Sequence, residues 1–315
     1  MTGDLHVFQV SLTTRFRGLT ARDGVLVRGA AGWAEFSPFW DYDDAASLPW
    51  WRCAVEAAEQ GWPDPVRETV PVNVTVPAVD PQTARRIVTG SGCTTAKVKV
   101  AEPGQDEAAD LDRVAVVRDA LGPGGRIRVD ANAAWDAATA VRRIRDLDRH
   151  AGGLEYVEQP CRTVDELAAV RRQIDVPIAA DESVRLAADP LRVVRAGAAD
   201  VVVLKVAPLG GVRACLRLVE QIRVPVVVSS ALETSVGLAA GVALAAALPE
   251  LPYACGLGTA RLLAADVVSD PLLPVDGVIA VRRPRVDLAR LADHKPPSDL
   301  VHRWEQRVSA AKGQT

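Results

Sequence analysis

Asp200-Val201-Val202-Val203-Leu204-Lys205 is an apolar run that ends in a charged residue. Four earlier runs have the same form: Ala96-Lys97-Val98-Lys99-Val100, Ile127-Arg128-Val129-Asp130, Leu154-Glu155-Tyr156-Val157-Glu158 and Pro177-Ile178-Ala179-Ala180-Asp181. The runs recur every 23 to 31 positions, a spacing that matches one strand plus one returning helix. In a closed barrel of parallel strands, the C-terminal strand ends converge on one mouth. We therefore expect the charged ends of these runs to surround a single point.

The chain follows the same alternation from residue 72 onward. Helical patterns separate the strands at residues 82–89, 106–121, 137–148, 164–174 and 212–221. The first strand of the series is Val72-Asn73-Val74-Thr75-Val76, and the eighth is Tyr253-Ala254-Cys255-Gly256. Nearly continuous Val and Ile content is typical of parallel strands that helices cover. The sequence thus predicts an α/β fold, a modified TIM barrel of (β/α)7β-like form, over residues 71–265.

The two ends of the chain do not share this rhythm. Residues 1–70 contain short strand patterns at 7–10 and 24–27, a tryptophan-rich stretch and a helical pattern near 52–60. We expect them to form a smaller α+β capping domain whose loops at 15–18 and 37–40 close over a ligand. Residues 266–315 end in an amphipathic helix at 299–311, whose apolar stripe needs a partner surface. We expect this C-terminal segment to pack back on the cap.

Bulk composition excludes several classes of function. The 315 residues are 49% hydrophobic, enough to bury a large core, and the net charge of −3 gives no footprint for nucleic acid or an anionic membrane. The first six residues lack the pattern of a signal peptide, and no uncharged run reaches the roughly 18 residues of a membrane span. We therefore expect a cytoplasmic enzyme with no nucleic-acid or membrane partner, and the family resemblance described below implies a small-molecule carboxylate substrate. The sequence does not fix its oligomeric state, and a monomer is compatible with it.

The cysteines do not indicate a disulfide framework or a zinc site. They are scattered, odd in number and never form a Cys-x-x-Cys pair: Cys53, Cys93, Cys161, Cys215 and Cys255. Cys161 follows Glu158-Gln159-Pro160 near the expected mouth, but no histidine ends a strand there to activate it. Free thiols are therefore the expectation.

Three acids end successive strands of the predicted barrel: Asp130, Glu158 and Asp181. Their hard anionic oxygens suit Mg2+, or Mn2+ as a substitute, better than zinc. Each acid alone is typical of a helix N-cap or a loop salt bridge. Brought together unpaired, however, the carboxylates would repel one another and raise their own pKa values, and a divalent cation keeps them ionised. We interpret the three as metal ligands.

Lysines stand one strand before these acids and one strand after them. Lys97 and Lys99 are two residues apart, hence on one face of a strand, and we expect their repulsion to lower their proton affinity. A lysine pKa lowered by roughly 2 to 3 units from about 10.4 would make a competent base at neutral pH. Lys99 is nearer to the strand end, and Lys205 would face it across the mouth. A surface role for Lys205 conflicts with the buried strand that carries it.

The motifs together resemble a known family. They read Lys97-Val98-Lys99, Asp130-Ala131-Asn132-Ala133-Ala134-Trp135, Glu158-Gln159-Pro160, Ala180-Asp181-Glu182-Ser183, Lys205 and Ser229-Ser230-Ala231-Leu232-Glu233-Thr234-Ser235. This pattern resembles the enolase superfamily, in its muconate-lactonizing subgroup, and within it the o-succinylbenzoate synthases in their short actinobacterial-type form. The likeness extends over nearly the whole chain. The lysines and acids are specific for the superfamily and less specific for the reaction.

The resemblance implies a lyase of menaquinone biosynthesis. Its members dehydrate 2-succinyl-6-hydroxy-2,4-cyclohexadiene-1-carboxylate to 2-succinylbenzoate, with Mg2+ to stabilise the enediolate left by removal of the α proton. By this likeness Lys99 takes the α proton and assists departure of hydroxide from the same face. Lys205 stays cationic on the other face and stabilises the intermediate by charge and by cation–π attraction.

Supporting roles follow from position, and each has a structural alternative. Arg128 lies on the strand face of Asp130 and is either a substrate contact or a buried ion pair. Asn132 either orients a bound group or caps the next helix. Ser229, Ser230 and Gly256 end the last two strands, where they hold the succinyl tail or form a structural turn.

Other functions use the same side chains. Two opposed lysines also suit an N-succinylamino acid racemase, a dipeptide epimerase or a muconate cycloisomerase. No Asp-x-Asp pair, which many dipeptide epimerases of the superfamily use, lies near Cys255-Gly256-Leu257-Gly258. A non-catalytic, metal-binding barrel is the alternative from a different class. Retention of both lysines and all three acids weighs against it.

Overall fold

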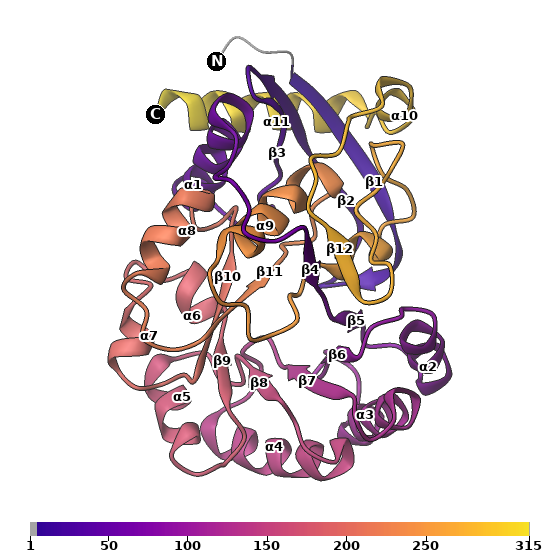
Figure 1. The fold of residues 1–315 in the computed structure, drawn as a ribbon, viewed down its shortest axis with the longest axis vertical. Helices are drawn as coiled ribbons and strands as arrows, with labels where there is room; N and C mark the ends of the chain where they lie inside the picture. The colour runs from indigo at the N-terminus through magenta and orange to yellow at the C-terminus, as the bar shows by residue number, and fades with distance from the viewer. Residues whose placement is uncertain (1–4, 315) are drawn as a thin grey trace.

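A barrel of parallel strands forms the larger part of the molecule (Figure 1). The structure is a computed structural model that describes residues 5–314. Seven strands run side by side in chain order: β5 (Val74–Val76), β6 (Thr95–Lys99), β7 (Arg126–Asp130), β8 (Tyr156–Glu158), β9 (Ile178–Ala180), β10 (Val201–Lys205) and β11 (Val226–Ser229). Bridges from Cys255 to Val72 and from Gly256 to Ser229 then join the last strand to the first. The predicted (β/α)7β-like barrel is confirmed, but the run expected as its eighth strand forms only these two isolated bridges.

Helices follow the strands and cover the outside of the barrel. The longer ones are α2 (Pro81–Thr89), α3 (Glu107–Leu121), α4 (Ala137–Ala151), α5 (Val164–Arg171), α8 (Val212–Val219) and α9 (Ser235–Ala247), and two short ones are α6 (Glu182–Arg185) and α7 (Arg192–Arg195). Local side chains begin several of them. Asp106 and Asp136 accept backbone N–H groups at the starts of α3 and α4, and Thr163 forms a capping box with Glu166 at α5.

The N-terminal part forms a cap over one end of the barrel (Figure 1). Its antiparallel sheet has the order β1 (Leu5–Phe16), β2 (Leu19–Gly29) and β3 (Gly32–Phe36). The short strands expected at 7–10 and 24–27 are therefore the middles of much longer ones. Alternating burial along β1 shows why, because the solvent-exposed face carries polar residues that weaken the apolar signal.

The cap helix starts earlier than the sequence indicated. Helix α1 (Asp44–Val55) passes into a π-helical turn, η1 (Glu56–Gln60), so the expected start near residue 52 is wrong. The side chain of Asp43 accepts the N–H of Ala46 and fixes the true beginning. Two short strands, β4 (Thr69–Pro71) and β12 (Val278–Ala280), pair antiparallel beside the barrel.

The C-terminal segment returns to the cap, as predicted. After η2 (Gly258–Leu262) and α10 (Leu288–Asp293), helix α11 (Ser298–Gly313) lies against α1, and Figure 1 shows the yellow C-terminal helix beside the indigo cap elements. Trp304 is fully buried there, packs edge-on against Phe36 at 5.9 Å between ring centroids and donates its indole N–H to Asp23 at 2.8 Å. Large aromatic burial of this kind ties the two chain ends together.

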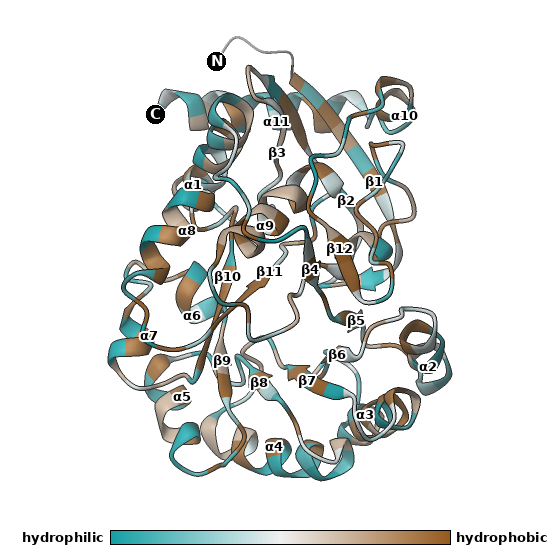
Figure 2. Cartoon of the chain, in the orientation of Figure 1, coloured by the Kyte–Doolittle hydropathy of each residue, from teal (hydrophilic) through white to brown (hydrophobic). Residues whose placement is uncertain are grey.

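Figure 2 shows that apolar residues dominate the barrel strands β10 and β11, whereas polar residues recur on the surrounding helices. One apolar cluster joins barrel and cap residues, among them Val98, Leu204, Phe36 and Trp50. Within residues 5–314, no helix is long and apolar enough to span a membrane. The first four residues, on which part of the signal-peptide expectation rests, lie outside the described residues. The domain limits at residues 70 and 265 stay a prediction.

Replacing Trp304 with alanine should destabilise the protein strongly. The change removes a fully buried side chain and its bond to Asp23, so we expect the free energy of unfolding to fall by about 3–5 kcal/mol in urea denaturation. Leu288→Ala is the control, because that side chain is 59% exposed and its loss should cost about 0.5 kcal/mol or less. Equal effects of the two changes would contradict the docking of α11 on the cap.

Candidate active site

Strand register brings the predicted residues to one level of the barrel. Lys99 on β6 pairs with Asp130 on β7, and Asp130 pairs with Glu158 on β8. Lys205 on β10 pairs with Ser229 on β11. Asp181 directly follows β9 and precedes α6. Because all these strands are parallel, their C-terminal ends face the same mouth.

A narrow cavity opens at this mouth, between the barrel and the cap. Its walls comprise Phe16, Arg17, Phe39, Thr75, Lys97, Lys99, Asp130, Asn132, Lys205, Ser229, Ser230, Ala231, Leu232, Gly256 and Thr259. Three of these come from the two cap loops that the sequence indicated, at 15–18 and 37–40. The ring of Phe16 lies 5.3 Å from the Lys99 ammonium, within cation–π range. The sequence did not indicate Thr75, Leu232 or Thr259 as site residues, because no motif in the neighbouring sequence marks them as functional.

Each acid is held by a cationic side chain. Lys99 donates to Asp130 at 2.6 Å, and Lys205 donates to Asp181 at 2.5 Å. Lys97 donates to both carboxylate oxygens of Glu158 at 2.9 Å. Charge-assisted hydrogen bonds of this length compensate part of the cost of removing the ions from water. The lysines are thus not surface residues.

The same surroundings set the pKa values of the carboxylates. Burial raises the pKa of Glu158 to about 7, and the charges of Asp130 and Asp181 add to this while Lys97 opposes it. Burial would also raise the pKa of Asp130, but Lys99 and Lys97 hold it well below its usual range. For Asp181 burial is likewise outweighed, and Lys205 and Arg185 lower its pKa to about 2.

The expected mutual lowering of lysine proton affinity is wrong for Lys97. Burial alone would lower its pKa, but the charges of Glu158 and Asp130 outweigh burial and raise it. Lys97 therefore acts as a fixed counter-charge. Lys205 differs, because burial lowers its pKa more than Asp181 raises it.

The chemistry of the three acids fits a hard divalent cation. Asp130, Glu158 and Asp181 are each at most 1% exposed, and they are near enough for Asp130 to raise the pKa values of the other two. In residues 5–314, no three acidic, histidine or cysteine side chains form a ready ligand cluster, since the ammonium groups stand against the carboxylate oxygens. Oxygen donors without nitrogen or sulfur are the ligands that Mg2+ and Mn2+ prefer.

Asn132 lies in the cavity wall and does not cap the next helix. Its backbone is left-handed, with φ of 46°, and its side-chain oxygen accepts a hydrogen bond from Lys99 at 2.6 Å. Asp136 caps α4 instead, which excludes the capping alternative for Asn132. Asn132 thereby fixes the position of the Lys99 ammonium from a second side.

Arg128 is not brought into the cavity. Its guanidinium donates to Glu155 at 2.5 Å and to the carbonyl of Ala254 at 2.6 Å, and it lies 4.7 Å from the ring centroid of Tyr156. The side chain is fully buried within the barrel, two residues before Asp130 on β7. This geometry favours the structural ion pair over a substrate contact.

Ser229, Ser230 and Gly256 do line the cavity. The Ser230 and Thr259 hydroxyls lie 2.6 Å apart, and Ser229 is 3.4 Å from the Gly256 carbonyl. A Cβ on Gly256 would lie 2.5 Å from the Ser229 hydroxyl oxygen, so glycine allows this close approach. The wall is polar on this side, and Ser229 lies on β11 next to Lys205 on β10.

Known protein families and individual proteins resemble this chain over most of its length. Residues 81–285 match the family described as Enolase C-terminal domain-like, and residues 7–58 match Enolase N-terminal domain-like. The o-succinylbenzoate synthase of Thermobifida fusca (strain YX) is 67% identical over 312 residues, which cover 99% of this chain and 96% of that protein. The o-succinylbenzoate synthase of Mycobacterium tuberculosis (strain ATCC 25618 / H37Rv) is 51% identical over 97% of this chain and 93% of its own.

Solved structures share the fold at lower identity. The muconate lactonizing enzyme of Pseudomonas fluorescens, complexed with muconolactone, superposes with a TM-score of 0.81 at 22% identity, over 94% of this chain and 98% of that one. The L-Ala-D/L-Glu epimerase of Bacillus subtilis gives a TM-score of 0.77 at 23% identity, over 91% of this chain and 97% of that one. These likenesses show the architecture alone.

The raised pKa of Glu158 predicts a pH effect on the metal-free protein. Between pH 4.5 and 7 the folded state keeps a proton that the unfolded state loses, so stability should fall as pH rises, by up to about 1.4 kcal/mol per pH unit. The glutamine of Glu158→Gln cannot titrate, so the free energy of unfolding of this variant should fall less steeply with pH. Urea denaturation in the presence of EDTA at several pH values would measure the slope. Glu250→Gln, at an exposed position, is the control. An unchanged slope in Glu158→Gln would contradict the prediction.

Proposed function

Because the chain belongs to the o-succinylbenzoate synthases of the enolase superfamily, we propose that it dehydrates 2-succinyl-6-hydroxy-2,4-cyclohexadiene-1-carboxylate (SHCHC) to 2-succinylbenzoate in menaquinone biosynthesis. One observation supports this most directly. Lys99 and Lys205 end strands β6 and β10, and the three buried acids occupy the strand ends between them. Such an arrangement suits removal of a proton α to a carboxylate.

Lys99 is the proposed base. Its amine takes the α proton of the substrate, and the electrons of that C–H bond move into the ring system. The resulting ammonium then donates the proton to the departing hydroxide on the same face, and water leaves as the ring becomes aromatic. Asp130 and Asn132, both 2.6 Å from the Lys99 ammonium, hold it at the cavity wall where the α carbon would lie.

Lys205 is proposed to remain cationic on the other face of the substrate. Burial lowers the pKa of Lys205, and its ion pair with Asp181, at 2.5 Å, offsets part of that fall. A fixed ammonium there attracts both the developing negative charge and the π face of the ring. Lys97, bound to Glu158, supplies a further positive charge beneath the site.

Asp130, Glu158 and Asp181 are the residues that would hold Mg2+, with Mn2+ as a substitute. When bound, the ion supplies positive charge next to the substrate carboxylate, whose oxygens gain negative charge as the α proton leaves. Ser229, Ser230 and Gly256 line the cavity and are the proposed contacts of the succinyl tail. Cytoplasmic location stays part of the proposal.

Replacing Lys99 with alanine should abolish turnover of SHCHC while the protein still binds Mg2+. Removal of a general base typically costs 10²–10⁴-fold in rate, so we expect kcat to fall by roughly a thousandfold or more. Initial rates would measure the loss, and calorimetric titration with Mg2+ would show retained binding. Lys295→Ala changes an exposed lysine far from the strand ends and should leave kcat unchanged. Wild-type activity in Lys99→Ala would overturn the assignment.

The choice of substrate is tested by a side-by-side comparison of rates. We expect kcat/KM for SHCHC to exceed that for N-succinyl amino acids by about tenfold or more, because only the former gains an aromatic ring in the transition state. EDTA should remove the activity, and added Mg2+ or Mn2+ should restore it. A large preference for N-succinyl amino acids would favour the racemase alternative. Activity that survives EDTA would contradict the proposed metal.

A further inference from the structure

Two buried ionisable residues of the cap contact the barrel beside the cavity. Arg22 on β2 is 2% exposed, and Glu35 on β3 is 6% exposed. Neither lines the cavity, and neither has a part in the proposed chemistry. Both contact the segment between β11 and α9, which contains the cavity-lining residues Ser230, Ala231 and Leu232.

Glu35 completes the N-terminus of the barrel helix α9. Its carboxylate accepts the backbone N–H of Thr234 at 3.1 Å and that of Gly237 at 3.2 Å, besides the Thr234 hydroxyl. A Cβ on Gly237 would lie 3.0 Å from the Glu35 carboxyl carbon, so glycine provides the room for this approach. Burial raises the pKa of Glu35 to about 7, and in either protonation state a carboxyl oxygen can accept the backbone N–H groups that lack partners within the helix.

Arg22 holds the preceding turn from the same side. Its Nε donates to the carbonyl of Leu232 at 3.1 Å, and another of its nitrogens donates to the carbonyl of Ser37. Its guanidinium lies 4.3 Å from the ring centroid of Phe39, which is itself part of the cavity wall. Arg22 therefore contacts the barrel side and the cap side of the wall at once.

The turn that these residues hold has an unfavourable backbone. Leu232 has φ of 65°, a left-handed conformation that costs a non-glycine residue roughly 1–2 kcal/mol. Hydrogen bonds maintain it: Leu232 N–H donates to the Ser230 hydroxyl at 3.3 Å, and Ala231 N–H donates to the Glu233 carboxylate at 2.8 Å. Such strain persists only where the surroundings fix it.

We propose that Arg22 and Glu35 are positioning residues for the substrate: from the cap, they hold the 230–234 turn so that Ser230 and Leu232 form the cavity wall. Neither residue touches the reacting atoms. The kinetic part of this inference rests on the proposed function, because it is read from turnover. The structural part, the ordering of the turn, does not depend on any activity.

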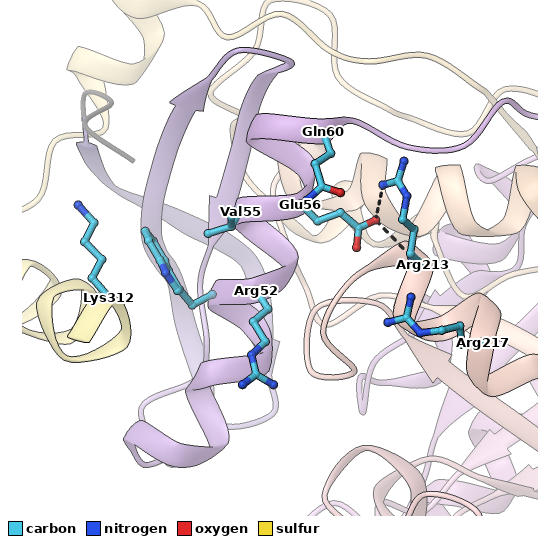
Figure 3. Close-up of a pocket in the computed structure, with 8 residues that line it drawn as sticks. Arg52, Val55, Glu56, Gln60, Arg213, Arg217 and Lys312 are labelled. Carbon is cyan, nitrogen blue, oxygen red and sulfur yellow. Dashed lines mark hydrogen bonds and ion pairs between the residues drawn. The ribbon is translucent and has the colours of Figure 1, made fainter. Parts of the chain in front are cut away.

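Glu56 offers a matched comparison, because it makes a chemically similar contact away from the cavity. It lies in η1 of the cap, and its carboxylate accepts the backbone N–H and the guanidinium of Arg213, both at 3.2 Å, at the start of α8 (Figure 3). The groove of Figure 3, lined in part by Arg52 and Arg217, shares no lining residue with the cavity.

The test compares Glu35→Met, which removes the acceptor at nearly constant size, with Glu35→Gln, which keeps one oxygen. With SHCHC and Mg2+, we expect Glu35→Met to raise KM about tenfold with kcat changed less than about threefold, and Glu35→Gln to restore KM to within about threefold of wild type. Glu56→Met should lower Tm but leave KM within about twofold. An unchanged KM in Glu35→Met, or an equal rise in Glu56→Met, would overturn the proposal.

Hydrogen exchange separates this proposal from the proposed function. The amides of residues 232–237 should exchange faster in Glu35→Met than in wild type. Their exchange rates should be unchanged in Glu56→Met, and both results are expected whether or not wild type turns over SHCHC. Inactive wild type with this exchange pattern would refute only the proposed function. Should Glu35→Met fail to fold, Arg22→Lys serves instead, because lysine lacks the Nε donor to Leu232. It should likewise raise KM and speed exchange at Leu232, and wild-type behaviour in both measurements would overturn the proposal.

Discussion

Charge balance among the buried side chains at the barrel mouth is the constraint on which the rest of the site depends. Three carboxylates that are at most 1% exposed cannot all remain ionised without compensating positive charge. The strands supply that charge in register, because Lys97 and Lys99 precede the acids and Lys205 follows them. The opposite pKa shifts of Asp130 and Glu158 show that the balance is local, since Asp130 contacts two ammonium groups and Glu158 contacts one.

The proposed divalent cation and the lysines therefore compete for the same oxygens. A lysine that serves only as a counter-ion has no reason to act as a base, because its ion pair favours the protonated form. In the proposed function the cation takes over part of the carboxylate charge, and the lysines are then distinguished by their other contacts. Lys99 keeps the neutral amide oxygen of Asn132 at 2.6 Å, whereas Lys97 has the two oxygens of Glu158. This difference fits Lys99 as the mobile proton carrier and Lys97 as a fixed charge.

The sequence predicted the barrel because five of its strands are short apolar runs that end in a charged residue or are directly followed by one, a pattern that is local and repeated. It predicted the meeting of Lys99, Asp130, Glu158, Asp181 and Lys205 for the same reason, since the C-terminal ends of parallel barrel strands converge on one mouth. It did not decide the role of Arg128, because strand periodicity gives the face of a residue and not its depth in the barrel. The start of α1 at Asp44 and the raised pKa of Lys97 depend on contacts that only the folded chain contains.

The hydrogen bonds from cap side chains to the starts of barrel helices could not be predicted from the sequence. Helix N-caps are sought within a few residues of a helix start, and the N-cap residue of α8 is Gly211, which offers no side chain. The acceptor for its first turn is Glu56, 157 positions earlier, and an acceptor for α9 is Glu35, 199 positions before Thr234. Without the cap, both helix starts would lose a carboxyl acceptor beside strands that carry Lys205 and Ser229. The two parts therefore depend on each other for hydrogen bonding as well as for apolar burial, so neither part is complete at the barrel mouth without the other.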